Sequence, residues 1–391
     1  MVEAAVLKDT SPRSAASIAR PIRLLVLTPK PSGLSPGQRF RLEQWAPRVA
    51  ADHGIAMDFV PFESPRLTEL LYQSGHRAEK AAWVLFDFAR RAREVFRARR
   101  YDGVVVYREA ALIGPAIYER AFRVAGVPMF FDFDDAIWQP GQISSANGVF
   151  SALHFWGKTS TTCRLSRGVI VGNDYLASYA RKRNLNVFVV PTSIELDRYP
   201  VQPELTSEKP FVVAWSGSTH TLQHFEHARE PLERLAKELP LVVKVICNKP
   251  PERPIDGAEN IFVPWSERGE AEAVGAAHVG IMPLPDDDYT RGKCGLKALQ
   301  FMATGRPVVI SPVGMNKELV TTGHNGFLAS TTDEWTDALR RLAASPVLRQ
   351  RLGRAGRETI EARYSADVVA GLFANAIRQS LAPRFPPGTR S

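Results

Sequence analysis

The sequence predicts an α/β protein built from two doubly wound, Rossmann-like domains that face a cleft, with a C-terminal helix that returns to the first domain. Three observations lead to this prediction. Short apolar runs typical of buried parallel strands alternate with helical patterns along the chain. A polar, proline-rich linker at residues 199–210 interrupts the alternation, which then restarts. The length of 391 residues suits roughly two or three domains.

The first domain is expected at residues 21–200, after a disordered lead-in at residues 1–20. Its strands are expected at 23–28, 57–62, 103–107, 128–133, 168–172 and 187–190. Its helices are expected at 40–53, 76–100, 112–125 and 175–183. Ligands of such sheets bind beyond the carboxyl ends of the strands, so the loops after these strands are candidate site segments.

The second domain is expected at residues 201–365. Its strands are expected at 211–215, 242–247, 260–263, 279–283 and 307–311. Its helices are expected at 222–238, 270–277, 297–303, 334–344 and 348–364. The last segment, 366–391, should form a helix over 366–380 that packs back on the first domain, followed by a short tail.

The charge of the chain is uneven. The formal net charge is +9, and nearly all of the excess lies in residues 1–200. A basic protein could bind nucleic acid, but neither an aromatic RNA-binding motif nor a helix-turn-helix pattern is present, so we expect no nucleic acid partner. The excess instead suggests an anionic acceptor or an anionic membrane surface.

The cysteines and the lack of membrane or signal segments indicate the same compartment. No apolar run approaches the ~20 residues of a membrane-spanning helix. The first 20 residues lack the apolar stretch of a signal peptide. The three cysteines, Cys163, Cys247 and Cys294, lie too far apart for a disulfide framework or a zinc site. We therefore expect a cytoplasmic protein, either free or peripheral on the inner face of the membrane.

The helix expected at 76–100 is the main basic feature, because arginines alternate there with aromatic side chains. A basic, aromatic amphipathic helix can lie on an anionic membrane surface. The alternative is a helix packed on the core with a solvated basic face. The pattern alone leaves both open.

Two motif regions go beyond a general α/β pattern. Residues 292–318 have the sequence GKCGLKALQFMATGRPVVISPVGMNKE, and residues 325–328 follow with NGFL. This run resembles the donor-binding region of retaining glycosyltransferases of family 4, which have the two-domain GT-B fold. Residues 127–138, VPMFFDFDDAIW, resemble the end of a strand in the first domain of part of that family. The resemblance covers residues 23–380 in arrangement and is specific from 261 to 364.

The resemblance implies an enzyme that moves a sugar, with retention of configuration, from a nucleoside diphosphate sugar of the UDP or GDP type. The acceptor would be a hydroxyl of a glycan, a lipid-linked glycan or a small molecule. No cofactor and no metal is expected. Two other functions stay open, a non-catalytic nucleotide-sugar binding protein and a nucleotide-sugar epimerase of the same fold.

The turn at residues 292–295 suits a diphosphate, which needs backbone N–H donors and positive charge. A Gly-rich turn that opens a helix offers both, through unpaired amides and the helix dipole. We expect Gly292, Cys294 and Gly295 to contact the donor, with Lys293 and Lys297 as the catalytic cations. The alternative is an ordinary helix start in an α/β domain.

Two more loops of the second domain are expected to bind the donor. The strand-to-helix turn that contains Ser216, Gly217, Ser218 and Thr219 has small donors but none of the basic residues usual in the family. The loop of Gly314, Met315 and Asn316 should direct amides toward the sugar or phosphate, with Glu318 close by. Glu318 could instead be an ordinary first-turn residue of a helix.

The chain departs from the family pattern at two positions. Gln300 stands where the family has a Glu that accepts hydrogen bonds from the ribose, and an uncharged amide accepts more weakly. Gly292 stands where the family has a Glu that contacts the donor hexose. The carboxylates at 286–288, or Glu318, could replace the latter.

Asp134 is the third expected catalytic residue, because it takes the place of a His that lines the sugar pocket in many family members. Asp135 is expected to bind the acceptor. An alternative for both is the N-cap of a helix beginning at Ala136. A weaker alternative is a magnesium site that also uses Asp132.

The remaining candidates follow two other strands of the first domain. Gly37 and Arg39 lie in the first strand-to-helix turn and are expected to reach the donor phosphate. Arg41 in the same segment, and Arg108 after the strand expected at 103–107, are expected to contact an anionic acceptor. Arg39 could equally be a solvated charge at a helix start.

Overall fold

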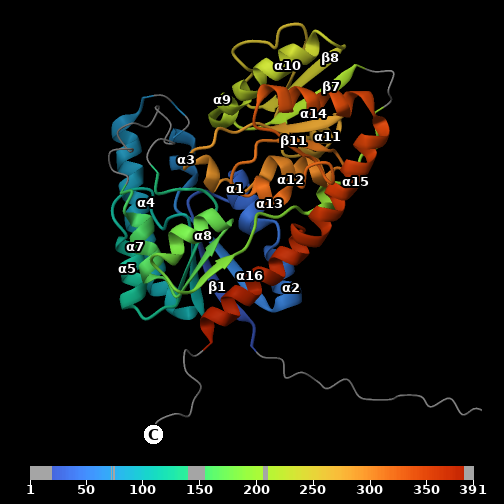
Figure 1. Ribbon diagram of the computed structural model, residues 1–391. Coiled ribbons are helices and arrows are strands. Elements are labelled where there is room, and N and C mark those ends of the chain that lie inside the picture. The colour runs from blue at the N-terminus through green and yellow to red at the C-terminus, as the bar shows by residue number, and fades with distance from the viewer. Residues whose placement is uncertain (1–19, 72, 74, 140–154, 206–209, 383–391) are drawn as a thin grey trace, which may run out of the picture.

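The computed structural model describes residues 20–71, 73, 75–139, 155–205 and 210–382. Nearly all of the expected lead-in and the tail after residue 382 lie outside the described residues. The described chain forms two six-stranded sheets, and every strand pair in them is parallel. Figure 1 shows the first sheet in the lower half of the molecule and the second above it. The predicted α/β fold with two domains is confirmed.

The first sheet has the order β2-β1-β3-β4-β5-β6. Its strands are β1 (Ile22–Thr28), β2 (Ile55–Pro61), β3 (Gly103–Tyr107), β4 (Met129–Phe133), β5 (Gly168–Val171) and β6 (Val187–Val189). Its helical elements are α1 (Pro36–Gln38), η1 (Arg39–Glu43), α2 (Ala46–His53), α3 (Pro65–Leu71), α4 (Arg77–Arg97), η2 (Ala98–Arg100), α5 (Ile117–Val124), α7 (Lys158–Leu165), α8 (Asp174–Arg181) and η4 (Leu196–Arg198). The strand order reverses at β1, so a ligand crevice is expected beyond β1 and β3.

The second sheet has the order β12-β11-β10-β7-β8-β9. Its strands are β7 (Phe211–Ser216), β8 (Leu241–Cys247), β9 (Glu259–Pro264), β10 (Val279–Met282), β11 (Val308–Ile310) and β12 (Phe327–Leu328). Its helical elements are η5 (Thr219–Thr221), α9 (Leu222–Phe225), η6 (Glu226–Ala228), α10 (Arg229–Ala236), α11 (Glu270–Gly275), η7 (Thr290–Gly292), α12 (Leu296–Ala303), α13 (Asn316–Leu319), α14 (Thr332–Ala344) and α15 (Pro346–Arg363). Here the order reverses at β7, which places the crevice beyond β7 and β10.

Both faces of the first sheet are buried, as its apolar strands predict. Leu24 and Val26 pack on one face with α2 and α16 (Ala366–Leu381), and the alternate residues pack on the other face with α4 and α5. The ring of Phe373 in α16 lies 4.7 Å from that of Trp45. The predicted return of the last helix to the first domain is therefore confirmed, and Figure 1 shows it crossing the lower half of the molecule.

Some expected elements differ in the structure. The expected helix at 112–125 begins only at Ile117, because Gly114 has a φ of 78° and the residue before Pro115 is driven away from the helical region. Residues 136–139 form a turn rather than a helix. The prediction that Asp134 or Asp135 caps a helix there is wrong. Several short elements lie outside the expected ranges: α1, α3, α7, β12 and the single turns η4, η5 and η7.

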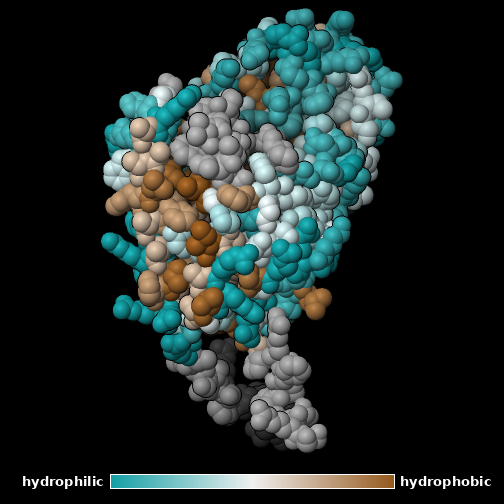
Figure 2. All heavy atoms as spheres, turned by 90° about the vertical axis from the view of Figure 1, so that its left-hand side faces the viewer, coloured by the Kyte–Doolittle hydropathy of each residue, from teal (hydrophilic) through white to brown (hydrophobic). Residues whose placement is uncertain are grey.

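Helix α4 has an unusual orientation. Its inner face buries Lys80, Asp87 and Arg91, whereas Leu85 and Phe86 are exposed. The face that carries α4 and α5 is turned toward the viewer in Figure 2, where hydrophobic side chains gather on it. Among the described residues, no helix is long and apolar enough to cross a membrane.

Candidate functional site

The ends of β3 and β4 bring two carboxylates and a guanidinium together. Asp134 follows β4, and its Oδ1 accepts hydrogen bonds from Tyr107 Oη at 3.0 Å and from Arg108 Nε at 2.8 Å. Arg108 Nη2 also donates to Asp135 Oδ2 at 2.5 Å. Arg108 has a φ of 60°, a left-handed conformation that is uncommon for a residue other than glycine. The two ion pairs hold this strained residue over both carboxylates.

The charge of this cluster is divided unequally. Burial alone would raise the pKa of Asp134, but the opposing charges of Arg108 and Arg41 prevail and hold it below the ordinary value. Burial raises the pKa of Asp135 in spite of Arg108 and Lys293 nearby. Neighbouring carboxyl groups whose pKa values are pushed apart can play different roles. Asp134 stays ionised at neutral pH, and Asp135 is the more readily protonated of the two.

The first strand-to-helix turn approaches this cluster through Gly37. A methyl group built on Gly37 would lie 2.8 Å from Tyr107 Oη, 3.0 Å from Asp134 Oδ2 and 3.1 Å from Arg108 Nη2. Tyr107 and Arg108 both donate hydrogen bonds to Asp134, so none of the three side chains can move without the others. A glycine here lets the turn lie directly on the carboxylate.

Gly37→Ala should therefore lower the unfolding free energy by about 1–3 kcal/mol and reduce activity at least tenfold, because the methyl group displaces Asp134 and Arg108. Urea unfolding and initial rates check both effects. Gly157→Ala is the matched control, since no atom lies within 4 Å of the methyl position there. Equal behaviour of the two variants would contradict the packing described.

On the second domain, the turn before α12 has free backbone donors. Gly295 has a φ of 64° and precedes α12, whose first turn has no side-chain cap. The first N–H groups of such a helix lack acceptors within the helix and can bind an anion. Gly314, Met315 and Asn316 lie behind this turn: a methyl group on Gly295 would lie 3.3 Å from Met315 Sδ, and Asn316 Nδ2 donates to the carbonyl of Ser311. They support the turn and do not project from it.

This turn touches the first domain. Cys294 Sγ donates to the carbonyl oxygen of Asp134 at 3.1 Å, and Asn173 Nδ2 donates to the carbonyl oxygens of Gly292 and Lys293, both at 3.1 Å. A methyl group on Gly292 would lie 2.8 Å from the backbone nitrogen of Ala136. In this arrangement no side chain fits at Gly292, which gives a physical reason for the missing Glu.

Two lysines stand beside the turn. The ammonium group of Lys293 lies 4.5 Å from the ring centroid of Tyr289. Lys297 is partly buried and forms no hydrogen bond or ion pair within the described part of the chain. Burial lowers the pKa of Lys297, the carboxylate of Glu270 opposes this, and the charges of Arg39 and Lys293 add to the lowering. An anion placed here would relieve the crowding of three cations.

A hydrogen-bonded network around Glu270 occupies two other expected donor residues. Glu270 Oε2 accepts from Arg39 Nη2 at 2.8 Å and from Tyr199 Oη at 2.7 Å, and Oε1 accepts from Trp265 Nε1 at 2.8 Å. Gln300 is fully buried, and its Nε2 donates to Tyr199 Oη at 2.8 Å. Gln300 and Arg39 are thus engaged with the protein itself. The sequence did not single out Glu270, which resembles an ordinary first-turn Glu of α11.

Arg41, expected to contact an acceptor, is engaged inside the first domain. Arg41 is buried and forms a bidentate ion pair with Asp132, at 2.8 and 3.1 Å. The structure therefore does not bring Arg41 to an acceptor, and Asp132 is not free to bind a metal. Within the described residues there is no group of three or more His, Cys, Asp or Glu side chains that could hold a metal ion.

The loop after β7 contributes less than expected. Ser216 is fully buried, and a methyl group on Gly217 would clash with the ring of Trp215. Ser218 caps the next turn through Thr221, and Thr219 is exposed.

The carboxylates that could replace the missing Glu are engaged elsewhere or exposed. Asp286 and Asp288 pair with Arg291, and Asp287 caps the turn at 287–290. Glu318 is exposed on the first turn of α13, as its alternative interpretation states.

His224 lies behind Lys293 and was not expected. Burial, with a contribution from Lys293, lowers its pKa to about 4. Because the unfolded chain then binds the proton first, stability should be lost as the pH falls from about 6.5 to 4. The unfolding free energy of the parent should fall on going from about pH 7 to about pH 4.5. In His224→Gln this fall should be smaller by about 2–3 kcal/mol. Urea unfolding at both pH values measures this, with the exposed His220→Gln as control; equal losses would contradict it.

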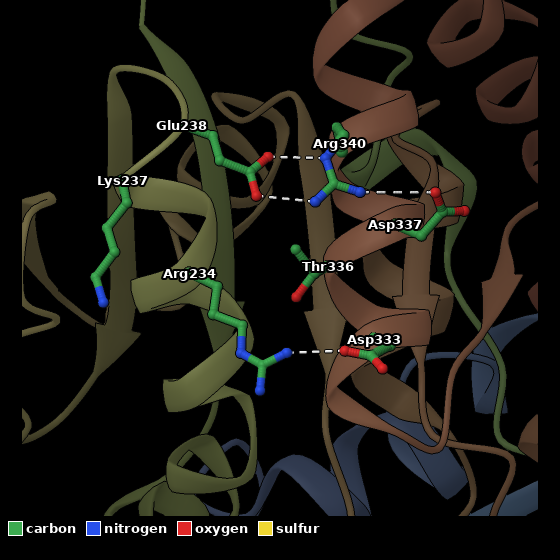
Figure 3. A pocket seen from close by; sticks show the side chains of 7 residues that line it. All are labelled: Arg234, Lys237, Glu238, Asp333, Thr336, Asp337 and Arg340. Atoms are coloured by element: carbon green, nitrogen blue, oxygen red, sulfur yellow. Dashed lines mark hydrogen bonds and ion pairs between the residues drawn. The ribbon is translucent and has the colours of Figure 1, made fainter.

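Two depressions in the described surface do not contain this cluster. One, of about 520 Å³, lies between α10 and α14 (Figure 3), where Glu238 pairs with Arg340 and Arg234 with Asp333. The other, of about 310 Å³, is lined by residues that include Asn173, Met315 and Glu318. The side chains of the first depression satisfy one another, whereas the strand ends of the first domain and the start of α12 bring uncapped amides, cations and ionised carboxylates together. We therefore assign the site to this place, where the two domains meet.

The second half of the chain matches a known protein family. Residues 210–345 match the family described as "Glycosyl transferases group 1". A D-inositol 3-phosphate glycosyltransferase of Stackebrandtia nassauensis is 37% identical over 103 residues, which is 25% of this chain and 23% of that protein. The chain thus matches about a quarter of the length of that relative.

Solved structures resemble the whole fold. Sucrose-phosphate synthase from Thermosynechococcus elongatus superimposes with a TM-score of 0.64 at 16% identity, covering 92% of this chain and 98% of the other. Anabaena HepE in complex with UDP and glucose superimposes with a TM-score of 0.63 at 14% identity, covering 92% and 100%. These likenesses confirm the predicted two-domain GT-B fold.

Proposed function

We propose that the chain is a glycosyltransferase that uses a nucleoside diphosphate sugar as donor. One observation carries the proposal: the uncapped first turn of α12, flanked by Lys293 and Lys297, lies across the cleft from the Asp134–Arg108 pair. The match of residues 210–345 to glycosyl transferases group 1 covers this turn. The UDP complex of the Anabaena neighbour supports a UDP-type donor for the same fold.

The geometry supports the following division of labour. The diphosphate would bind the N–H groups of the first turn of α12, with Lys293 and Lys297 as counter-charges. The bond between the anomeric carbon and the phosphate oxygen breaks, and the diphosphate leaves with the electron pair. The acceptor oxygen bonds to the anomeric carbon, and its proton passes to the departing phosphate oxygen. Asp134 would hold a hydroxyl of the sugar or the acceptor, and Arg108 would keep that carboxylate in place.

We propose retention of configuration and independence of metal ions as finer features. The resemblance to retaining family 4 enzymes supports the first. The two lysines support the second, since they can supply the charge that a metal ion would otherwise bring to the diphosphate. Gly292 and Gln300 imply that the hexose and the ribose are held by other groups than in that family. Because the 292–295 turn touches Asp134, a sugar can enter only when the domains separate at this contact.

A panel of nucleotide sugars, with and without hydroxyl acceptors, tests this function. We expect release of the nucleoside diphosphate, faster with an acceptor, and a product with the anomeric configuration of the donor. Binding without release would favour a nucleotide-sugar binding protein. Interconversion of the sugar would favour an epimerase. Loss of activity with a metal chelator would overturn metal independence alone.

A further inference from the structure

Helices α4 and α5 present an outer face of unusual composition. Each exposed residue of these two helices is Ala, Leu, Phe, Ile, Val or Arg. The large apolar members are Leu85, Phe86, Phe96, Ile117 and Val124, which are 62%, 55%, 73%, 47% and 88% exposed. We call these residues, with the exposed arginines of 77–123, the α4–α5 face. Figure 2 shows hydrophobic side chains gathered on this side of the first domain.

The core does not require this arrangement. Three charged residues of α4, Lys80, Asp87 and Arg91, point inward: Arg91 donates to the carbonyl oxygens of Val60 and Thr28, and Lys80 donates to that of Gln73. Buried charges of this kind are costly and need specific partners. The helix therefore buries charged groups at the ends of β1 and β2 beside core residues such as Val84, while other large apolar side chains, Leu85, Phe86 and Phe96, stay exposed. Exposed apolar patches of this size mark interaction surfaces.

The charges around the patch have one sign. The exposed cations beside the apolar side chains are Arg93, Arg97, Arg99, Arg100, Arg120 and Arg123. The acidic side chains of α4 and α5 compete little with them: Asp87 and Glu119 are buried, Glu94 is mostly covered and pairs with Arg97, and Glu79, in the first turn of α4, pairs with Arg66. A second copy of the chain would place arginines against arginines on this face.

We propose that the α4–α5 face binds the surface of an anionic phospholipid bilayer. The apolar side chains would enter the boundary between headgroups and acyl chains, and the arginines would contact the lipid phosphates. This assignment does not depend on the proposed glycosyltransferase activity. The surface also differs from the basic face expected at residues 76–100. Lys80, Arg90 and Arg91 of that segment donate hydrogen bonds to backbone carbonyl oxygens of the protein itself.

Co-sedimentation with vesicles tests the assignment. We expect the full chain to bind vesicles of phosphatidylcholine with phosphatidylglycerol, to bind pure phosphatidylcholine far more weakly, and to lose binding as salt rises from 0.1 to 0.5 M. Leu85→Ser with Phe86→Ser should lower the binding constant at least tenfold. Arg93→Ala with Arg123→Ala should lower it by about fivefold per arginine.

The matched control is Val347→Ser with Arg354→Ala on α15, where both side chains are exposed. It should bind vesicles like the parent. A second readout uses Trp83, whose ring lies 5.2 Å from that of Phe86: brominated anionic lipids should quench fluorescence in the parent and much less in Trp83→Phe.

Equal binding to neutral and anionic vesicles, or no binding to either, overturns the proposal. So does a concentration-dependent dimer that Leu85→Ser with Phe86→Ser dissolves, or capture of an acidic protein with no affinity for lipid. Release of nucleotide from a donor sugar in solution should be unchanged in the serine variant. Failure of the lipid assay is thus distinguishable from failure of the proposed enzyme activity.

Discussion

Lys297→Ala is expected to lower turnover with the preferred nucleoside diphosphate sugar by about 10²–10³-fold. Lys297 is partly buried, has no ion-pair partner among the described residues, and stands beside the uncapped first turn of α12. Its charge is disfavoured in the empty protein, because burial and the charges of Arg39 and Lys293 lower its pKa and the carboxylate of Glu270 offsets this only in part. A diphosphate supplies the counter-charge that this lysine lacks, so its removal should weaken both donor binding and departure of the leaving group.

The measurement compares initial rates and nucleotide affinity in the parent and the variant. Lys237→Ala is the control, since this exposed lysine lies on α10 by the depression of Figure 3, outside the cleft. Unchanged turnover in Lys297→Ala would remove Lys297 from the donor site. Because the substitution removes one of three crowded cations, the variant without ligand should be at least as stable as the parent in urea unfolding.

Asp134→Asn should lower turnover by about 10²–10⁴-fold while leaving nucleotide affinity within a few-fold of the parent. The amide has nearly the same shape as the carboxylate but no charge. The amide cannot balance the charge of Arg108. It accepts the hydrogen bonds from Tyr107 and Arg108, whose donor atoms lie within 3.0 Å of Oδ1, more weakly than a carboxylate does. The sugar or acceptor hydroxyl then loses its ionised partner, and the diphosphate keeps its own.

A combined rate and binding measurement separates these two roles. Asp288→Asn is the control, because this exposed carboxylate pairs with Arg291 and accepts a hydrogen bond from Tyr175, and neither of these belongs to the Asp134–Arg108 pair. If Asp134→Asn loses nucleotide affinity in proportion to turnover, the aspartate acts on the fold of the cleft and not on the transferred group. If turnover is unchanged, Asp134 has no part in the reaction.

Much of the fold follows from local patterns. The parallel strands at β1, β3, β4, β7, β8 and β10 are short apolar runs that any buried parallel sheet requires. The turn at 292–295 and the aspartates after β4 were singled out from sequence, and the structure brings them within hydrogen-bond distance through Cys294 and Asp134. Strand ends of two facing sheets meet in the same cleft, which is why motif position was informative here.

The contacts that complete the site could not be predicted in this way. Asn173 and Gly292 are 119 residues apart, and Tyr199 and Glu270 are 71 residues apart. In sequence, Asn173 resembles a helix cap, which it also is, and Tyr199 resembles part of a loose linker. Hydrogen bonds of this kind depend on how the two domains pack, and no local propensity records that.

The orientation of α4 could not be predicted from its sequence pattern. Helical periodicity separates apolar from charged positions but does not say which side faces the sheet. The ends of β1 and β2 offer carbonyl oxygens to Arg91 of α4, so this arginine is held inward, whereas Arg93 and Arg97 of the same helix are exposed. The same reasoning explains Arg41, whose carboxylate partner, Asp132, is buried in β4.

The central claim is that the first turn of α12 and its lysines hold a diphosphate, and titration calorimetry tests it most directly. UDP or GDP should bind at least 100-fold more tightly than the corresponding nucleoside, and in Lys297→Ala most of this difference should disappear. The parent should show the same preference without added metal and in the presence of a chelator. Equal affinities for nucleoside and nucleoside diphosphate, or a difference that survives the loss of Lys297, would contradict the account.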